Sequence, residues 1–368
     1  MNFPEQIPLN DLSRWESTEK AEILSAIGEV VKSGVFINGP HVSAFEEKLG
    51  KLIGKRFVVG VGNGTDALVL SLLAIGIGKG DLVGTVANAG GYATNAILQI
   101  GAEPLLIDVD VQTAQMSCVD LKEKLSRSQK VKAVIVTHLY GLMANTKAIR
   151  EAVESHGSLL IEDCAQAIGA QLDGTPAGAF GCASTFSFYP TKNLGCLGDG
   201  GAIAFESRIH ADYSRKLAQY GWSTRYVVDY QFGMNSRFDE IQAAVTNVRL
   251  KNLEAKNRVR QKIINKYQSS VGSSRRMIGS EARSNSGYLA VLVSPRRSED
   301  QKKFTDAGIQ TAVHFPVLDH RQSAWRNQFA GVNLPNSEFL VDQILTIPCF
   351  PNLTEIEIER VCETLARL

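Results

Sequence analysis

The chain has 368 residues, of which 44% are hydrophobic and 21% charged, and its formal net charge is +1 at pH 7. This length exceeds one ordinary hydrophobic core and favours two structural units. The scattered, balanced charge excludes the basic footprint of a nucleic-acid-binding protein. No stretch reaches the roughly 18 consecutive apolar residues that span a membrane, so no membrane partner is expected.

The cysteines and the N-terminus indicate the compartment. The first residues carry no basic region followed by an apolar run, so we expect no signal peptide. The cysteines form no C-x-x-C pair and no metal-ligand spacing, and we therefore expect small buried side chains in a reducing compartment and no metal site. The sequence predicts a cytoplasmic protein. The cysteines are Cys118, Cys164, Cys182, Cys196, Cys349 and Cys362.

The first two thirds of the chain have alternating helix and strand signals. Apolar spacing predicts helices over 17–32 and 42–53 before the alternation begins. Runs of Val, Ile and Leu at this rhythm are typical of a mainly parallel sheet buried on both faces, so the fold class is α/β. The predicted strands are 56–61, 81–86, 104–109, 131–139 and 159–161, and the predicted helices are 65–75, 92–100 and two more around Leu121 and Ile149.

The last third of the chain predicts a smaller α+β unit. A long helix is expected over 239–267, followed by a Ser- and Arg-rich loop or hinge over 269–287. The final helix begins with a capping box, Thr354 with Glu357 three residues on. We expect two domains, 1–248 and 249–368.

An acidic residue stands at the end of a predicted strand. The apolar run 159–161 is followed by Glu162 and Asp163, which places Asp163 at the carboxyl edge where open α/β sheets bind ligands. The alternative is that Asp163 only caps the next helix. Asp163 alone does not decide between these two roles.

The segment 185–195 holds one lysine in a constrained turn. An aromatic-rich strand runs into Pro190 and Lys192, and glycines follow at positions 195, 198, 200 and 201. Such a lysine is expected to be partly desolvated, which favours the neutral amine that attacks an aldehyde. The alternative is an ordinary exposed turn lysine.

A glycine-rich turn, Gly62-Asn63-Gly64-Thr65, joins the strand 56–61 to the next helix. Backbone N–H groups at a helix N-terminus, together with the Thr65 hydroxyl, form a cradle for phosphate. The turn lacks the G-x-G-x-x-G spacing of a dinucleotide site and the G-K-[ST] of a P-loop. With the acid and the lysine, it forms the set that pyridoxal phosphate (PLP) requires: a phosphate anchor, an anion beside the ring nitrogen and an amine for the aldehyde.

On these residues the sequence resembles the DegT-type sugar aminotransferases, a branch of the aspartate-aminotransferase-like (fold type I) superfamily of PLP enzymes. The resemblance implies a mainly parallel seven-stranded sheet with helices on both faces and a smaller C-terminal α+β domain. It runs in order along nearly the whole chain. The matching stretches are Gly62–Leu68, His138–Gly141, Ile161–Gln166, Ser187–Asn193, Gly198–Gly201 and Gly233–Ala244.

The resemblance implies a role for each matching residue. Lys192 would bind the cofactor covalently and then carry the proton between the substrate carbon and the cofactor. Asp163 would keep the ring nitrogen protonated, and Gln166 would lie against the ring near its 3-hydroxyl. Asn235 would reach the phosphate in the neighbouring subunit, which implies a homodimer with shared active sites. The residues implied to hold the phosphate within one chain are Gly64, Thr65 and Ser187, which suits charge-assisted hydrogen bonds to a dianion.

One stretch departs from the family pattern. The aromatic residue that the family places over the cofactor ring is displaced here to Tyr92, within Asn88-Ala89-Gly90-Gly91-Tyr92. This stretch, 219–222 and 314–322 resemble the subgroup that aminates C3 of TDP-linked 3-keto-6-deoxyhexoses. Tyr189, His314 and His320 are then candidate substrate contacts, although a structural role for each histidine is an open alternative.

The expected reaction is a transamination in two halves. An amino acid, by resemblance L-glutamate, gives its amine to the cofactor, and the loaded enzyme aminates a TDP-3-keto-6-deoxyhexose. The alternatives are the same chemistry at C4 of a UDP- or GDP-linked sugar, a sugar dehydrase of the same family in which histidine replaces the lysine, a non-catalytic regulator of the same fold, and a nicotinamide dehydrogenase. Lys192 disfavours the dehydrase, and the weak glycine fingerprint disfavours the dehydrogenase.

Overall fold

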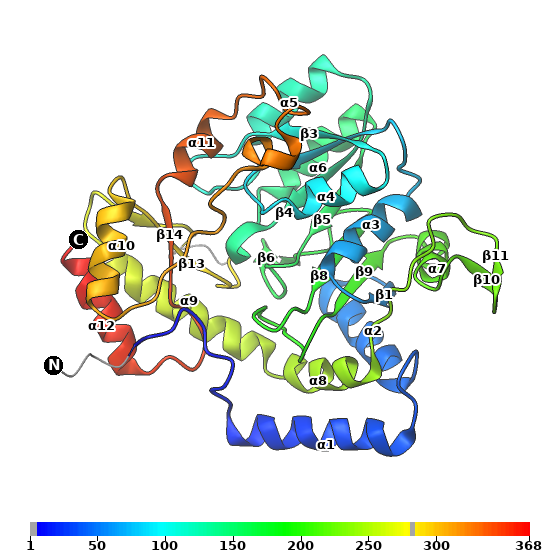
Figure 1. The fold of residues 1–368 in the computed structure, drawn as a ribbon, viewed down its shortest axis with the longest axis horizontal. Coiled ribbons are helices and arrows are strands. Elements are labelled where there is room, and N and C mark those ends of the chain that lie inside the picture. The colour runs from blue at the N-terminus through cyan, green and yellow to red at the C-terminus, as the bar shows by residue number, and fades with distance from the viewer. Residues whose placement is uncertain (1–5, 280–283) are drawn as a thin grey trace.

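The computed structural model describes residues 6–279 and 284–368 (Figure 1). Its largest sheet has seven strands in the order β1-β9-β8-β5-β4-β2-β3. Only β9 is antiparallel to its neighbours, which confirms the mainly parallel sheet. The strands are β1 (Phe57–Val61), β2 (Leu82–Val86), β3 (Glu103–Ile107), β4 (Val131–Thr137), β5 (Leu159–Asp163), β8 (Ala183–Ser187) and β9 (Gly201–Phe205).

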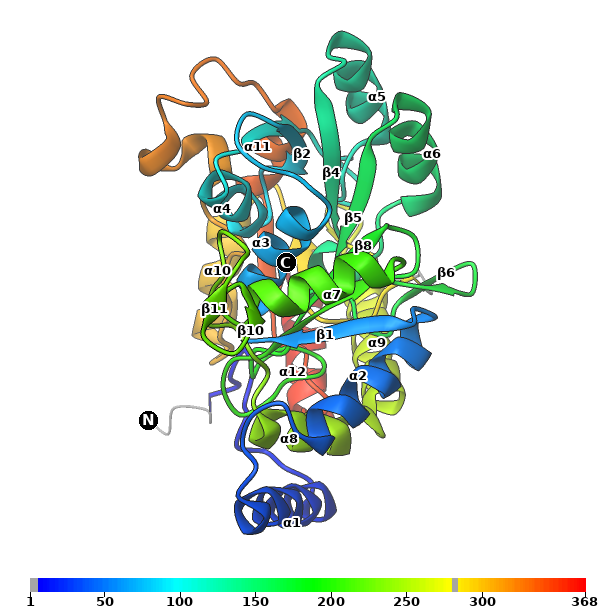
Figure 2. The ribbon, with the colours of Figure 1, turned by 90° about the vertical axis from the view of Figure 1, so that its right-hand side faces the viewer.

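Helices cover both faces of this sheet (Figure 2). Successive strand residues point to opposite faces, so in β4 Ala133 is buried on one face and Val134 on the other. Burial on both faces explains why these strands are continuous apolar runs. One face packs against α3 (Gly64–Ala74), α4 (Tyr92–Gln99) and α7 (Arg208–Leu217), and the other against α2 (Pro40–Ile53), α5 (Cys118–Arg127) and α6 (Thr146–His156).

A smaller unit with its own core follows. Its antiparallel sheet has the order β12-β13-β14 and packs against helices through a cluster that includes Tyr267, Leu292 and Phe304. The predicted capping box is confirmed, because the Thr354 hydroxyl accepts a hydrogen bond from the Glu357 N–H (3.2 Å). The elements are α9 (Leu253–Ser270), β12 (Arg276–Met277), β13 (Ala290–Val293), α10 (Arg297–Asp306), β14 (Ile344–Ile347) and α12 (Glu355–Ala366).

The single helix expected over 239–267 is wrong, because two helices occupy this range. α8 (Glu240–Leu250) packs against α1 (Ser17–Ser33) and α2, whereas α9 packs against α12 and β12. Asn252 interrupts them with φ −106° and ψ 3°. Asparagine is a weak helix former, and the break lets the chain pass from one core to the other.

The division into domains 1–248 and 249–368 stays a prediction. The helix break at Asn252 lies close to the expected boundary. Contacts also cross it: Leu318, Phe329 and Leu334 pack against Ala87 and Leu106 of the large sheet region. Ile7 also packs in the core of the smaller unit and pairs with Ile309, so the N-terminal segment joins that unit as well.

The hairpin of β10 (Trp222–Thr224) and β11 (Val227–Val228) projects from the body on the side opposite the smaller unit (Figure 1). Among the described residues, we find no helix with the length and apolar character needed to cross a membrane. The remaining short elements are β6 (Gln171–Leu172), β7 (Thr175–Pro176), η1 (Leu139–Gly141), η2 (Asp319–Arg321), η3 (Ser323–Trp325) and α11 (Pro335–Val341).

Candidate active site

A cavity of about 460 Å³ lies at the carboxyl edge of the large sheet. Small-molecule sites in proteins span roughly 300–1,000 Å³. The carboxyl ends of β1, β5 and β8 supply one side of its lining, and the C-terminal segment supplies Tyr288, His314 and Phe315. The structure brings together, along its lining, the predicted residues Gly64, Thr65, Tyr92, Asp163, Gln166, Ser187, Tyr189, Lys192 and His314.

Asp163 ends β5 as a buried carboxyl. It accepts hydrogen bonds from the backbone N–H of Ala165 (3.0 Å) and the hydroxyl of Thr137 (3.4 Å). Burial raises its pKa, and the Ala165 hydrogen bond and the charge of Lys192 partly offset that rise. Among the ion pairs of residues 6–279 and 284–368, none includes this carboxyl. A protonated ring nitrogen placed beside it would supply the missing cation.

Lys192 lies on a tight turn after β8. Its backbone N–H donates to the carbonyl of Tyr189 (2.8 Å). A Cβ on Gly195 would lie only 2.3 Å from the carbonyl oxygen of Pro190, so the turn requires glycine there. The side chain of Lys192 reaches the cavity, where its Nζ is 4.7 Å from the centre of the Tyr288 ring.

The N-terminus of α3 forms one end of the cavity. The Asn63 side chain caps this helix by accepting a hydrogen bond from the Asp66 N–H (2.8 Å). A Cβ on Gly64 would lie 2.8 Å from the Cβ of Ser187, so glycine is what lets the two segments approach. Gly64 and Thr65, at the start of α3, and Ser187 line the same cavity, and N–H groups at a helix N-terminus are suited to bind phosphate.

Aromatic side chains form the opposite wall. Tyr92, at the start of α4, is 49% exposed, and its ring meets that of Phe315 edge-on at 5.9 Å. His314 accepts or donates a hydrogen bond at Nδ1 with the Thr346 hydroxyl (2.9 Å). Burial and the charge of Lys192 lower the pKa of His314, so the imidazole is neutral at pH 7.

Buried polar groups next to the cavity hold Gln166 and the end of β5 in place. Gln166 accepts a hydrogen bond from the Tyr140 N–H (2.7 Å). His138 and Glu162, both fully buried, are joined through Nε2 and Oε2 at 3.0 Å. Ligand atoms of His138, Glu162 and Cys164 lie within 4.8 Å of one another. The second ring nitrogen of His138 accepts from the Ala144 N–H, however, so both nitrogens are engaged within the protein.

Two predicted site residues lie outside the cavity. His320 is 4% exposed, does not line this cavity, and its Nε2 is hydrogen-bonded to Glu338 (2.9 Å), an arrangement that suits the structural alternative, whereas its contact with substrate stays a prediction. Asn235 is exposed and does not line the cavity of its own chain. It pairs with Gln219 at the base of the hairpin.

Sequence reasoning missed several residues at this site. Tyr288, Phe315 and Asp199 line the cavity. The Ser236 hydroxyl accepts from the Gly62 N–H (2.9 Å) and donates to Asp66 (2.6 Å), which fixes the turn before α3. Asp199 and Ser236 lie within stretches that carried the resemblance, so those motifs could have found them. Tyr288 had no comparable signal, because only the fold brings it to Lys192.

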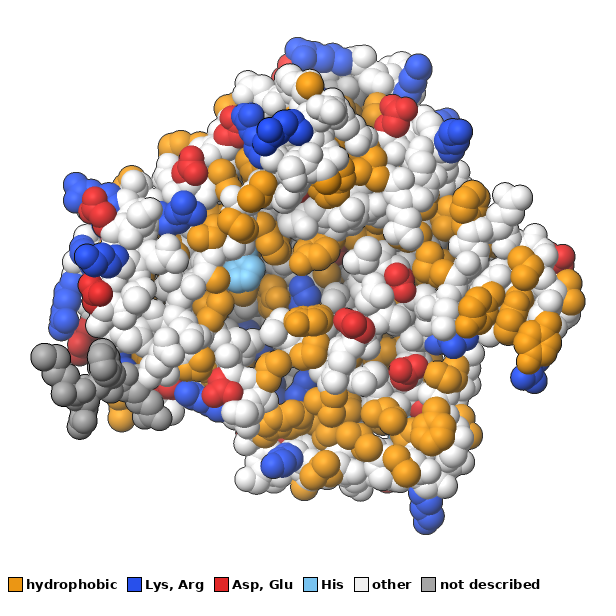
Figure 3. All heavy atoms as spheres, in the orientation of Figure 1, with side chains coloured by type: hydrophobic (Ala, Val, Ile, Leu, Met, Phe, Trp, Pro, Cys, Tyr) orange, Lys and Arg blue, Asp and Glu red, His pale blue; other side chains and the backbone are white. Residues whose placement is uncertain are grey.

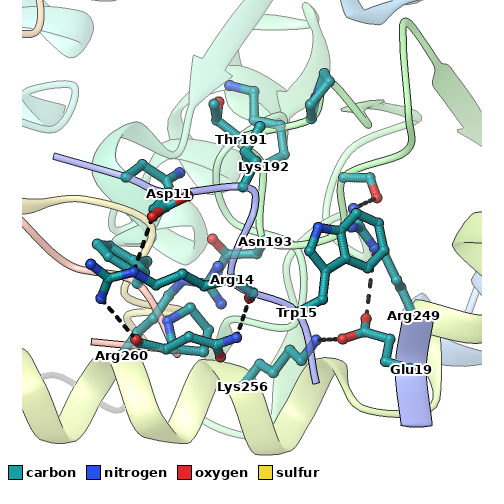
Figure 4. Close-up of a pocket in the computed structure, with 17 residues that line it drawn as sticks. Asp11, Arg14, Trp15, Glu19, Thr191, Lys192, Asn193, Arg249, Lys256 and Arg260 are labelled. Carbon is teal, nitrogen blue, oxygen red and sulfur yellow. Dashed lines mark hydrogen bonds and ion pairs between the residues drawn. The ribbon is translucent and has the colours of Figure 1, made fainter. Parts of the chain in front are cut away.

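A second, smaller recess of about 80 Å³ lies behind the lysine turn (Figure 4). The Lys192 side chain extends away from Arg14 and Trp15 in this recess. Behind the turn, Arg249 and Lys256 form ion pairs with Glu19 of α1. The turn is therefore held from behind by α1, α8 and α9.

The chain belongs to the DegT/DnrJ/EryC1/StrS aminotransferase family, whose model matches residues 17–366. This match confirms the resemblance found in the sequence and identifies the chain as an aminotransferase. Enzymes of this family are PLP-dependent, so PLP is the cofactor. The anion, amine and phosphate cradle described above fit that cofactor.

Curated relatives cover nearly the whole chain. The chain is 33% identical to a pleiotropic regulatory protein of Geobacillus stearothermophilus (98% of each chain). It is 34% identical to a UDP-N-acetyl-3-dehydro-alpha-D-glucosamine 3-aminotransferase of Acidithiobacillus ferrooxidans (98% and 97%). It is 35% identical to a dTDP-3-amino-3,4,6-trideoxy-alpha-D-glucose transaminase of Micromonospora megalomicea (94% of each).

Solved structures share the fold. DesV from S. venezuelae, crystallised with a ketimine intermediate, superposes with a TM-score of 0.94 at 31% identity over 99% of this chain and 98% of that one. NtdA from Bacillus subtilis, with the cofactor PMP bound, gives a TM-score of 0.93 at 28% identity over 100% and 86%. The fold type I α/β architecture expected from the sequence is confirmed.

Proposed function

We propose that this enzyme transfers an amino group from L-glutamate to C3 of a dTDP-linked 3-keto-6-deoxyhexose. The observation that carries the proposal is that Lys192 and Asp163 line one cavity, with the N-terminus of α3 at its end. These are the groups needed to hold PLP by its aldehyde, its ring nitrogen and its phosphate.

PLP supplies an aldehyde that takes up the amino group and a ring that accepts an electron pair from the substrate carbon. In our proposal Asp163 holds the proton on the ring nitrogen, since a buried carboxylate stabilises an adjacent cation. Gly64, Thr65 and Ser187 bind the phosphate through N–H and hydroxyl groups. Gln166, which is fixed by the Tyr140 N–H, lies against the ring near its 3-hydroxyl.

The amine of Lys192 moves the proton in both halves of the reaction. With glutamate it would take the proton from the substrate carbon and deliver it to the former aldehyde carbon of the cofactor, and with the keto sugar it would carry a proton in the opposite direction. The neutral imidazole of His314 adds no second positive charge to this side of the cavity. Tyr92 and Phe315 exclude water from the ring face, and Tyr189 and His314 contact the sugar.

The cavity of one chain lacks the cations that its proposed substrates require. Among the described residues that line it, Lys192 is the single Lys or Arg, whereas Asp163 and Asp199 are acidic. Glutamate brings two carboxylates and the sugar a diphosphate, which need positive partners. We infer a homodimer in which the hairpin segment of one protomer completes the other's cavity. The hairpin carries Arg225 between its two strands, and Arg237 follows two residues after Asn235.

The molecular surface supports a second copy as the partner. Figure 3 shows hydrophobic side chains gathered around α1 and α8 and on the hairpin. Exposed apolar groups of this extent mark interaction surfaces rather than a solvated face. The exposed fractions are 43% for Val35, 47% for Phe36, 40% for Ile37, 63% for Val228 and 66% for Phe232.

The choice of C3 rests on the motif resemblance and on relatives whose names specify a 3-amino or 3-keto sugar. The second candidate is amination at C4 of a UDP- or GDP-linked 4-keto sugar. Cytoplasmic location is part of the proposal, and the free state of all six cysteines supports it.

Incubation with glutamate and matched 3-keto and 4-keto nucleotide sugars tests the proposal. We expect a 3-amino product from the dTDP-3-keto sugar and no product with Lys192→Ala. Amination of the 4-keto sugar alone would select the second candidate. Failure to aminate any of them with Lys192 intact would contradict the proposal.

A further inference from the structure

Asp319 is a buried acid outside the cavity that joins two segments of its aromatic wall. Its side chain is 1% exposed. One carboxyl oxygen, Oδ2, accepts a hydrogen bond from the Thr94 hydroxyl (2.5 Å) of α4. Its backbone N–H donates to the carbonyl of Ala87 (2.9 Å). Asp319 thereby links the segment that carries Tyr92 to the segment that carries Phe315.

The turn before Tyr92 depends on this contact region. Gly90 and Gly91 both have φ of +78°, a conformation that favours glycine. A Cβ on Gly91 would lie 2.9 Å from Cη2 of Trp325. The turn therefore packs directly on the Trp325 ring, which lies on the same segment as Asp319 and reports on the geometry of this wall.

No cation compensates the Asp319 carboxyl in the described part of the chain. Its second oxygen, Oδ1, is buried without a hydrogen-bond partner there. Burial raises the pKa of Asp319 to about 7, although the hydrogen bond from the Thr94 hydroxyl and the Gly91 backbone act in the opposite direction. The neutral acid leaves one polar atom unpaired, whereas the carboxylate leaves a charge unpaired, which costs more.

The titratable groups on the surrounding elements are engaged elsewhere. On α11, Glu338 is hydrogen-bonded by His320 (2.9 Å) and Arg321 (2.8 Å), the two residues after Asp319. On α4, the Tyr92 phenol lines the cavity. On the preceding segment, His314 is hydrogen-bonded to Thr346. Ionisation at this junction is therefore assigned to Asp319.

We propose that Asp319 is a positioning residue that, as the neutral acid, holds the Gly91–Tyr92 turn against the Trp325 segment and shapes the cavity wall. Loss of its proton, which passes to solvent, loosens that wall. The inference rests on the proposed function only where it gives Tyr92 a place beside the cofactor and sugar. The state of the junction itself is measurable without any substrate.

The full-length protein labelled with 5-fluorotryptophan tests the junction directly. The ¹⁹F resonance of Trp325, assigned by its loss in Trp325→Phe, should shift with pH with a midpoint of about 7. Asp319→Asn should remove that titration. Asp342→Asn, which replaces an exposed aspartate at the end of α11, should leave it unchanged. A Trp325 titration that survives in Asp319→Asn, or a flat wild-type curve, would overturn the inference.

Variants of Thr94 test the direction in which the midpoint of the Trp325 titration moves. Its hydroxyl favours the charged carboxylate, so Thr94→Val should move the Trp325 midpoint to higher pH, whereas Thr94→Ser should keep it. A midpoint that moves to lower pH in Thr94→Val contradicts the assigned hydrogen bond. The serine variant also separates loss of the hydroxyl from loss of packing.

Kinetics connect the junction to the cavity. In the wild type the KM for the keto sugar should rise roughly fivefold or more between about pH 6 and pH 8.5, with a smaller change in kcat, and Asp319→Asn should flatten this rise. An equal rise in Asp319→Asn would refute the positioning role. Absence of turnover in every variant, with the Trp325 titration intact, would instead count against the proposed function alone.

Discussion

The amine of Lys192 lies 4.7 Å from the centre of the Tyr288 ring. Lys192 follows β8 of the large sheet, whereas Tyr288 precedes β13 of the smaller one. An ammonium group over an aromatic face is stabilised by about 0.5–2 kcal/mol, depending on its exposure to water. The Tyr288 ring can therefore hold the charged amine in the cavity before the cofactor binds.

Replacement of Tyr288 should separate the ring from the hydroxyl. Tyr288→Phe retains the aromatic face and should load PLP as the wild type does. Tyr288→Leu removes this stabilisation of the ammonium form, so more of the amine is neutral and PLP loading at pH 7 should become faster by about 2- to 30-fold, the range that corresponds to the cation–π free energy. Loading is followed by absorbance after the apoprotein is mixed with PLP. Equal effects of Phe and Leu would contradict a role for the ring.

Gly64 should be required for the phosphate cradle. A methyl group there would meet the Cβ of Ser187 at 2.8 Å, so Gly64→Ala should push apart the α3 N-terminus and the Ser187 hydroxyl. We expect PLP affinity to fall at least about tenfold, or roughly 1.4 kcal/mol. Gly28→Ala is the matched control, because a Cβ at Gly28 in α1 has nothing within 4 Å. Unchanged PLP affinity in Gly64→Ala would argue against the cradle.

The stability of the protein should depend on Asp319 in one pH window. Its pKa rises from 3.8 to about 7 on folding, so the folded state binds the extra proton between these values. The stabilisation is complete below about pH 4 and is lost as pH rises to about 7. The difference in free energy of unfolding between the wild type and Asp319→Asn should therefore change by on the order of 4 kcal/mol across this window, with the wild type losing stability as pH rises.

Urea unfolding at fixed protein concentration, from about pH 4 to pH 8, measures this difference. Asp342→Asn serves as the control: it removes an exposed carboxyl, and its plot of unfolding free energy against pH should run parallel to that of the wild type. If the wild-type plot runs parallel to that of Asp319→Asn instead, the Asp319 carboxyl ionises at its ordinary pKa and the prediction is wrong.

Two inactive variants should restore activity when mixed. If Asn235 serves the cavity of the neighbouring subunit, then Lys192→Ala and Asn235→Ala each lack one group, and their heterodimer has one complete site. Random reassociation should recover up to about one quarter of wild-type activity. Activity is measured after partial denaturation and refolding of the mixture. No recovery would place both groups in the same subunit's site.

Much of the fold was accessible from the sequence because the strands are buried on both faces. Their Val- and Ile-rich runs and the glycines between them set the parallel sheet and the order of its elements. The break at Asn252 was missed because the apolar spacing continues on both sides, and only the separate packing of α8 and α9 reveals the change of direction.

Site residues could be predicted from the sequence where their position follows from the strand or turn that carries them. Lys192 and Asp163 stand at the ends of neighbouring strands, β8 and β5, so the fold necessarily brings them to one edge. The surroundings of His320 could not be predicted, because its partner Glu338 lies on another element, α11. Tyr288 reaches Lys192 only through the packing of the two units, which no local pattern reports.

Covalent capture of the cofactor tests the central claim most directly. The PLP-loaded protein is reduced with borohydride, digested, and mapped by mass spectrometry. The account predicts the reduced cofactor on Lys192 alone, and no stable adduct in Lys192→Ala. An adduct on another lysine, with Lys192 unmodified and the enzyme active, would contradict it.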